Sequence, residues 1–365
     1  MKRIFTVLTS IALTFALSFS AAFANDDAFL KSQNYLKTIA LDSPDAVIAY
    51  EATGMEADYK ADALLNNFKE TDYTTASYGD LAKSIIAISL LGENPKDFNK
   101  INLVEILENR VQEDGTLTND VNGGCGATIW TLMALETVNS PKVKAVADKL
   151  STMAMDNGAY WYEYKGQNAD LDTTGWAMEA LSVAGRSTYK AAISKAYTFV
   201  QSKLNSTDGY YDNWGGNADT QSCVLEGLSV AGYTLDTNAY NYLLSYQNED
   251  GTFNALNYST GQLEPNAYAS VEGARALGVI NNGSFVLMAR RDYTNTTTPV
   301  VTEPETPTTP STTTPAVKPE TTTTEPKKET VKVVNTGDNT NVMAYVVAAI
   351  AAVGVIVLVI KSKKK

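Results

Sequence analysis

The apolar residues of this chain recur in a fixed pattern. Between residues 25 and 292 an apolar segment returns six times, and each copy ends in Gly or Asn. The copies end at positions 54, 92, 139, 185, 232 and 278, so successive ends are 38, 47, 46, 47 and 46 residues apart. A fixed period of this size predicts a repeat architecture built from one supersecondary unit.

More polar segments lie between the apolar ones. In residues 189–204 the apolar positions 193, 196, 197, 200 and 204 follow the i, i+3/i+4, i+7 spacing of an amphipathic helix. Turn dipeptides follow most of these segments, at Asp114-Gly115, Asn157-Gly158, Asp208-Gly209 and Asp250-Gly251. Gly permits the positive φ that ends a helix and reverses the chain. Each unit is therefore predicted to be an outer helix, a turn and an inner helix.

The inner helices are predicted to be buried on more than one side. They are apolar nearly all round and rich in Ala, Gly and Ser, which let helices approach closely. An open solenoid needs polar capping units, but the last apolar segment, residues 265–278, is no more polar than the middle ones. We therefore expect an all-α fold, an α/α toroid (α6/α6 barrel) of six helical hairpins over residues 25–292, and a monomer.

The N-terminal residues predict a secretory signal peptide, residues 1–24. Lys2 and Arg3 form a positive start, residues 4–19 are mostly apolar, and a small-x-small cleavage site places the cut between Ala24 and Asn25. The alternative is a membrane anchor, which the short apolar run and the well-formed cleavage site disfavour.

Residues 293–333 are nearly all Thr, Pro, Glu, Lys and Val. They have too little apolar content to form a core and are predicted to be a disordered stalk. Prolines favour an extended chain, so the stalk would hold the folded domain away from the cell surface and toward something outside.

Residues 334–365 contain an apolar run, 342–360, that is long enough for a single transmembrane helix, and a tail of four lysines follows it. The sequence Val333-Val334-Asn335-Thr336-Gly337-Asp338 precedes this run. The three parts resemble the sorting signal of Gram-positive surface proteins, although Val333-Val334 replaces the usual Leu-Pro pair. The resemblance implies sortase cleavage between Thr336 and Gly337, covalent linkage to cell-wall peptidoglycan, and membrane contact only through the helix before processing. A plain membrane anchor is the alternative.

Composition excludes several functions. The chain has 29 Lys and Arg against 41 Asp and Glu, a net charge of −12, so it lacks the basic surface that nucleic-acid binding needs. It contains no His, which removes His-based nucleophilic sites and His-ligated zinc. Its two cysteines cannot form a four-thiolate metal site, so we expect no metal site and no cofactor. Cys125 and Cys223 belong to non-adjacent repeats and are expected to be small buried side chains rather than a disulfide.

Two segments resemble known motifs. Leu243, Gln247, Gly251 and Phe253 match the Gln–Trp repeat of triterpene cyclases with Phe for Trp, and residues 168–174 match the acid motif of class II terpene cyclases. Together with the period, they resemble the prenyltransferase-like repeats of squalene–hopene cyclases, protein prenyltransferase β-subunits and cobalamin-transporting proteins. This family implies the toroid fold.

The resemblance implies three activities, and they fit unequally. Cyclase chemistry would use Asp172 as the acid with Asp170 as its acidic neighbour, but Thr173 stands where the family has a second Asp. Protein prenyltransferases need a zinc site that includes His, which this chain lacks. The cobalamin carriers use the toroid as a binding scaffold with the ligand across its mouth, and they are the nearer analogy.

The loops before the inner helices should open at one end of the ring, where they carry aromatic and acidic residues. Aromatic faces with a few carboxylates suit a glycan, a peptide or an organic cation. The candidate ligand-binding residues are Trp161, Tyr162, Asp172, Tyr211, Trp214, Asp219, Tyr258 and Glu264. In an enzyme, acid–base chemistry would fall to Asp172, Asp170, Glu163 and Asp219. The structural alternatives are that Asp172 and Asp219 are helix N-caps and that the Trp and Tyr side chains fill gaps between hairpins.

Three hypotheses therefore stand for a secreted, cell-wall-anchored bacterial protein. The first is a binding module for an external small molecule, glycan or peptide. The second is a secreted terpene-cyclase-like or carbohydrate-active enzyme, and the third is an adhesin or spacer without a pocket. The sequence favours the binding module.

Overall fold

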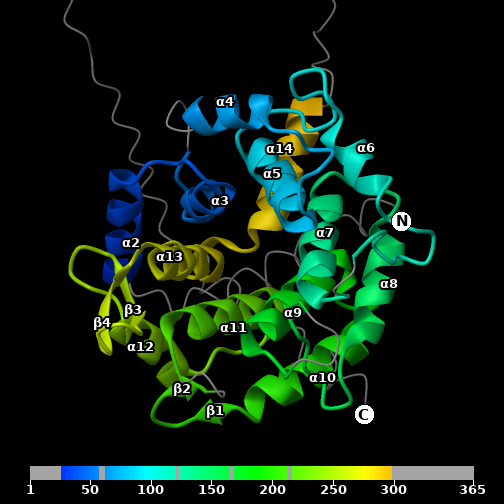
Figure 1. The fold of residues 1–365 in the computed structure, drawn as a ribbon. Coiled ribbons are helices and arrows are strands. Elements are labelled where there is room, and N and C mark those ends of the chain that lie inside the picture. The colour runs from blue at the N-terminus through cyan, green and yellow to red at the C-terminus, as the bar shows by residue number, and fades with distance from the viewer. Residues whose placement is uncertain (1–25, 57–61, 121–122, 164–167, 212–215, 298–365) are drawn as a thin grey trace, which may run out of the picture. The chain divides into compact units, whose positions relative to one another are not determined.

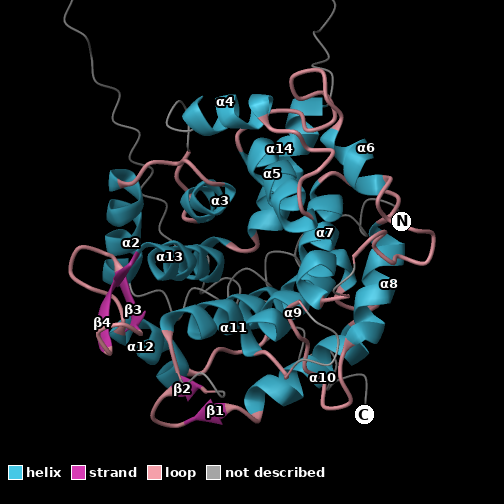
Figure 2. Cartoon of the chain, in the orientation of Figure 1, coloured by secondary structure: helices cyan, strands magenta, loops and turns pink. Residues whose placement is uncertain are grey.

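The structure, a computed structural model, describes residues 26–297 except 57–61, 121–122, 164–167 and 212–215. These residues lie within one compact unit, Met1–Val301. The described part is mostly helical, with four short strands, which confirms the all-α prediction (Figure 2). None of its helices is both long and apolar enough to span a bilayer. The predicted signal peptide, transmembrane helix and sorting signal fall outside the described residues, as does the stalk beyond residue 297.

The apolar segments form the inner helices. These are α3 (Pro44–Ala52), α5 (Tyr78–Leu90), α7 (Cys125–Thr137), α9 (Leu171–Gly185), α11 (Ala218–Ala231) and α13 (Ala267–Asn282). Each inner helix packs against the next, and α13, the last in sequence, packs against α3 (Figure 1). Within the described chain the inner helices therefore form a closed succession.

Glycines set how closely the inner helices approach. A Cβ on Gly227 of α11 would lie 2.1 Å from the backbone oxygen of Gly175 in α9. At the closing contact, a Cβ on Gly278 of α13 would lie 2.7 Å from the backbone of Ala52 in α3. Real Cβ atoms are not found at such distances, so these backbones approach closely only because a side chain is absent.

The polar segments form the outer helices. These are α2 (Asp26–Thr38), α4 (Asp62–Glu70), α6 (Leu103–Glu108), α8 (Val143–Met153), α10 (Lys190–Gln201) and α12 (Thr237–Ser245). The predicted helix over 189–204 is α10, and Ile193, Ala196 and Val200 of its apolar stripe are buried. Burial of a single face is what the 3.6-residue period of its apolar positions requires.

Each Asp-Gly or Asn-Gly turn lies within one repeat and contacts the outer helix of the next. Gly115, Gly158, Gly209 and Gly251 all have positive φ, as predicted. A Cβ on Gly158 would lie 2.3 Å from the Lys195 carbonyl oxygen of α10, and one on Gly251 would lie 2.1 Å from the Lys31 carbonyl oxygen of α2. The turn at Gly251, the last of the four, therefore contacts α2 in the same way that the turn at Gly158 contacts α10. This contact between the last turn and the first outer helix closes the outer layer as well.

A buried residue follows each of three turns and ties it to the next inner helix. The backbone N–H groups of Tyr160, Tyr210 and Phe253 donate to side chains in the first turns of α9, α11 and α13. Phe253 is the aromatic residue of the Gln–Trp-like segment, and its ring fills the space beside Gly273. Gln247 of the same segment donates to the Ala28 carbonyl and the Ser32 hydroxyl of the first outer helix. The segment therefore helps to close the ring.

Four short strands form two antiparallel hairpins. The pair β1 (Leu204–Asn205) and β2 (Gly209–Tyr210) flanks a turn, and β3 (Phe253–Asn257) with β4 (Gln262–Asn266) leads into α13. In the second hairpin Leu256 pairs with Leu263 (Figure 2). Neither hairpin is part of the predicted two-helix unit.

The last described helix, α14 (Phe285–Thr297), packs against α3, α5 and α7. Phe285 is fully buried and stacks on Trp130 of α7 at 6.2 Å between ring centroids. Farther along α14, Arg290 pairs with Glu136 at the C-terminal end of α7, and Thr296 donates to the Gly92 carbonyl beyond α5. This helix therefore occupies the ring at the C-terminal ends of the inner helices, and the N-terminal ends form the other rim.

Candidate functional site

Side-chain caps fix the start of most inner helices at this N-terminal rim. Ser43, Ser77, Asp170, Asn217 and Asn266 each accept a hydrogen bond from a backbone N–H in the first turn of their helix. Such caps satisfy N–H groups that have no partner within the helix.

The structural alternative for Asp172 and Asp219 is wrong, because Asp170 and Asn217 are the N-caps of α9 and α11. Asp172 and Asp219 instead lie within the first helical turn. One carboxylate oxygen of each, Oδ1, is buried without a hydrogen-bond partner. These two acids therefore carry unmet acceptor capacity at the rim.

Burial controls the protonation of these acids. It raises the pKa of Asp172 well above its ordinary range, the charge of Asp170 adds to the rise, and a hydrogen bond with Thr220 opposes it. Burial also raises the pKa of Asp219, against the opposing charge of Arg275. Asp170, the N-cap of α9, thus contributes to the raised pKa of Asp172.

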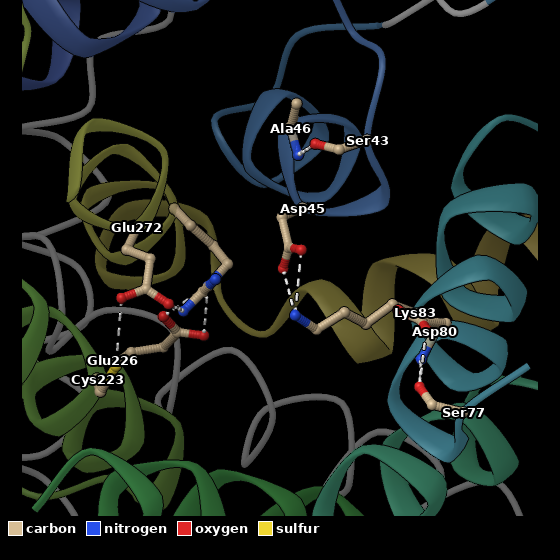
Figure 3. A network of polar contacts seen from close by, with 10 residues as sticks. Ser43, Asp45, Ala46, Ser77, Asp80, Lys83, Cys223, Glu226 and Glu272 are labelled. Carbon is tan, nitrogen blue, oxygen red and sulfur yellow. Dashed lines mark hydrogen bonds and ion pairs between the residues drawn. The ribbon is translucent and has the colours of Figure 1, made fainter. Parts of the chain in front are cut away.

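One layer of side chains inside the ring comes from a single repeat position. Asp45, Lys83, Trp130, Trp176 and Cys223 each lie nine residues before the end of their repeat. The Lys83 ammonium is 2.8 Å from an Asp45 oxygen and 4.6 Å from the ring centroid of Trp130, and Trp130 meets Trp176 edge-on at 5.8 Å. Figure 3 shows Asp45 and Lys83 pointing toward each other from α3 and α5. This layer joins four successive repeats.

A second layer is charged and fully enclosed. Glu179, Glu226 and Glu272 each lie six residues before the end of their repeat. The Arg275 Nε is 3.0 Å and 3.2 Å from the two oxygens of Glu226, and its Nη2 is 3.6 Å from Glu272. Ser284 donates to Glu179 at 2.8 Å. Figure 3 places Glu226 and Glu272 close together.

The one cation in this second layer does not balance its three carboxyl groups. Burial raises the pKa of Glu272 to about 7, and Arg275 works against that rise. The pKa of Glu179 is well above its ordinary range because the group is buried and Glu226 lies beside it. Burial thus makes Glu179 and Glu272 weaker acids than they are in water.

The predicted aromatic residues separate into two groups. Trp161 is buried, and its carbonyl accepts from the Cys125 N–H at the start of α7. Tyr162 is 46% exposed, with its ring centroid 6.4 Å from that of Trp176. Tyr211 and Tyr258 are exposed, the latter by 82%, so no burial holds either ring.

Two further predicted residues are not placed in the interior. Trp214 lies outside the described residues. Glu264 lies in β4, where Asn257 and Thr260 donate to its carboxylate and lower its pKa. Its carboxylate is thus engaged within the β3–β4 hairpin.

A cavity opens where the starts of α5 and α7 meet the segment that carries Tyr162. Its volume is about 310 Å³, and Trp130 and Tyr162 line it with the carboxylates of Asp120 and Glu163. Gly124 and Gly126 bring that segment close, because a Cβ on Gly126 would lie 2.7 Å from the Tyr162 ring. Tyr78 lines it as well, so the cavity combines three aromatic residues with two acids.

Sequence reasoning missed most of the interior residues. The signal was present, because a Glu recurs at one position of the last three apolar segments, at 179, 226 and 272. A charged residue at a repeated place in an apolar helix needs a buried partner. Asp45 and Lys83 gave no such signal, because charges near helix starts are common on protein surfaces.

The described residues contain no group of three or more acids and cysteines arranged to hold a metal ion. Cys125 and Cys223 are both free and fully buried, which confirms that they do not form a disulfide. The Cys223 sulfur lies 3.8 Å from an oxygen of Glu272. Both thiols are therefore shielded from solvent in the folded chain.

Comparisons with known proteins identify no family for this chain. No family model matches the chain, and no curated protein matches it. A crystal structure of a protein from Actinoplanes aligns over 76% of this chain and 99% of its own, with a TM-score of 0.44 and 13% sequence identity. A likeness this distant carries no argument about function.

Proposed function

We propose that the protein is a cell-wall-anchored bacterial surface protein whose ring of helices is an α/α toroid of six hairpins and binds an external ligand at its N-terminal rim. The observation that carries the proposal is the cavity at the starts of α5 and α7, which is lined by aromatic and acidic residues. At the same rim, in the first turns of α9 and α11, Asp172 and Asp219 each have a buried oxygen without a partner. Unpartnered buried polar groups are rare in folded proteins, and a bound ligand is one way to satisfy them.

The position of α14 supports this choice of rim. It occupies the ring at the C-terminal ends of α5 and α7. A ligand would therefore enter from the opposite end, where Asp172 and Asp219 carry buried oxygens without partners. The stalk predicted for residues 293–333 would hold this end away from the wall.

Binding is tested with the full-length chain purified in detergent and screened by thermal shift against small molecules, neutral glycans and peptides. Substitution Asp172→Asn should weaken the ligand that emerges, because the amide replaces one acceptor oxygen with a donor. The exposed acid Asp156 provides the control Asp156→Asn. A screen without any stabilising ligand, or equal affinities in the two variants, would overturn a rim site that uses Asp172.

A secreted enzyme of the cyclase or carbohydrate-active type is the second candidate. The raised pKa of Asp172 favours it, because a carboxyl group that retains its proton to higher pH is better suited to act as a general acid. Turnover of a ligand that is lost in Asp172→Asn, while binding persists, would select the enzyme. An adhesin or spacer would show neither binding nor turnover.

Anchoring is tested separately by the substitution Thr336→Ala. Sortase linkage predicts that muralytic enzyme, and not detergent, releases the unsubstituted protein from intact cells. Thr336→Ala should move the protein into the detergent-soluble fraction or the medium. Release of the unsubstituted protein by detergent alone would leave a plain membrane anchor.

A further inference from the structure

We propose that the rim cavity between α5 and α7 recognises a substituted ammonium group, with Tyr162 as its exposed aromatic wall and Asp120 and Glu163 as its counter-charges. This rests on the proposed binding function and names the chemical class of the ligand. The cavity of about 310 Å³ lies at the small end of the range for ligand sites, about 300–1,000 Å³, and suits a headgroup or one side chain.

The fold already binds an ammonium group beside this cavity. The Lys83 ammonium lies 4.6 Å from the centroid of Trp130 and is paired with Asp45 at 2.8 Å. Lys83 is still 21% exposed on its side chain and Asp45 26%, so the pair is in contact with solvent. Lys83 therefore shows an aromatic ring and a carboxylate together contacting an ammonium group in this protein, and the cavity offers the same chemical elements with Tyr162 and two acids.

The charge around the cavity favours a cation over an anion. The described residues that line the cavity include two carboxylic acids, Asp120 and Glu163, and neither Lys nor Arg. Arg110, which lies 5.7 Å from the ring of Tyr78, donates to the carbonyls of Tyr73, Thr74 and Ala76 and is thereby held in place. The described lining therefore offers acidic and no basic side chains to an entering ligand.

The pKa of the Tyr162 hydroxyl group reflects the negative charge around it. Its pKa is raised by burial and then by the charges of Glu163, Asp45, Asp80 and Glu272, all of them carboxylates. Beside it, the Trp176 indole N–H is buried without a hydrogen-bond partner, and Trp176 is only 7% exposed.

The test uses two ligands of the same shape and different charge. Choline and its neutral carbon isostere 3,3-dimethylbutan-1-ol are titrated into the full-length chain in detergent by calorimetry. Nα-acetyl-lysine amide is titrated in parallel, so that a free quaternary ammonium is distinguished from a side-chain ammonium. Binding of either cation with at least tenfold weaker binding of the isostere is the expected result, and this preference should shrink at high salt.

Variants connect the binding to this cavity. Tyr162→Leu should weaken cation binding about 2- to 30-fold, the range measured for cation–aromatic contacts, while Tyr162→Phe should preserve it. Asp120→Asn and Glu163→Gln should each weaken the cation and leave the isostere unchanged. The exposed acid Glu113 is not among the lining residues and gives the charge-matched control Glu113→Gln.

The outcomes separate this inference from the proposed function. Equal affinities for choline and its isostere, or a loss in Glu113→Gln as large as in Glu163→Gln, overturn the ammonium site and leave the binding function standing. Failure of both cations to bind overturns the ammonium site as well. The wider screen of glycans and peptides then decides the proposed function by itself.

Discussion

Closure of the ring depends on the contact between the last turn and the first outer helix, and Gly251→Ala tests it. Gly251 has φ +85°, and a Cβ there would lie 2.1 Å from the Lys31 carbonyl oxygen and 2.6 Å from its carbonyl carbon. A left-handed conformation costs a non-glycine residue about 1–2 kcal/mol. Relief of the clash adds about 1–3 kcal/mol of overpacking. We therefore expect Gly251→Ala to lower the free energy of unfolding by about 2–5 kcal/mol.

The matched control is Gly261→Ala. Gly261 has φ +69° and nothing within 4 Å of an added Cβ, so it carries only the conformational cost of about 1–2 kcal/mol. Both variants are unfolded in urea and followed by tryptophan fluorescence. Gly158→Ala, whose Cβ would lie 2.3 Å from the Lys195 carbonyl oxygen, should match Gly251→Ala, because the two contacts are equivalent. Equal losses in Gly251→Ala and Gly261→Ala would refute closure through this contact.

Three further predictions concern the interior of the ring. Arg275→Met should lower the free energy of unfolding by about 3–5 kcal/mol, because it leaves the buried carboxyl groups of Glu226 and Glu272 without their cation. Adding Glu226→Gln should restore part of this loss. A loss below about 1 kcal/mol in Arg275→Met would contradict the prediction. The pKa of Glu272 rises from its ordinary 4.5 to about 7 on folding, so the folded chain retains a proton that the unfolded chain releases. The free energy of unfolding should therefore fall as the pH rises from 4.5 to 7, by on the order of 3 kcal/mol from this group. Glu272→Gln should flatten this part of the plot of unfolding free energy against pH, measured by urea unfolding. An unchanged slope in Glu272→Gln would contradict the raised pKa of Glu272. Cys125 and Cys223 should react with a thiol reagent only after unfolding, and fast labelling of the native chain would contradict their burial.

The sequence was sufficient for the helical units and their order. The apolar stripe of residues 193–200 and the positive φ of Gly158 and Gly251 follow from local rules, and the structure has them as predicted. Helix α14 was not among the predicted elements. It belongs to no repeat, so the period gave no sign of it, and its place is set by contacts such as the stacking of Phe285 on Trp130.

The candidate site was less accessible to sequence reasoning. Tyr162 and Glu163 were singled out and do line the rim cavity, and Asp172 was singled out and carries a buried oxygen without a partner. Asp120 and Trp130 complete the cavity and were missed. Trp130 lies in an inner helix that is apolar nearly all round, and such a helix has no polar face to show which side points into the ring.

What the sequence by itself determined is the repeating unit, because helix periodicity, turn glycines and end caps act over a few residues. What only the tertiary structure decided is which side chains meet across the ring. Glu226 and Arg275 form a salt bridge although they are 49 residues apart in the sequence. Lys83 of the second repeat contacts Trp130 of the third. These contacts depend on how each helix is rotated about its axis and on how closely the helices approach at Gly175, Gly227 and Gly278. The rotation and the close approach are both fixed by packing against neighbouring repeats.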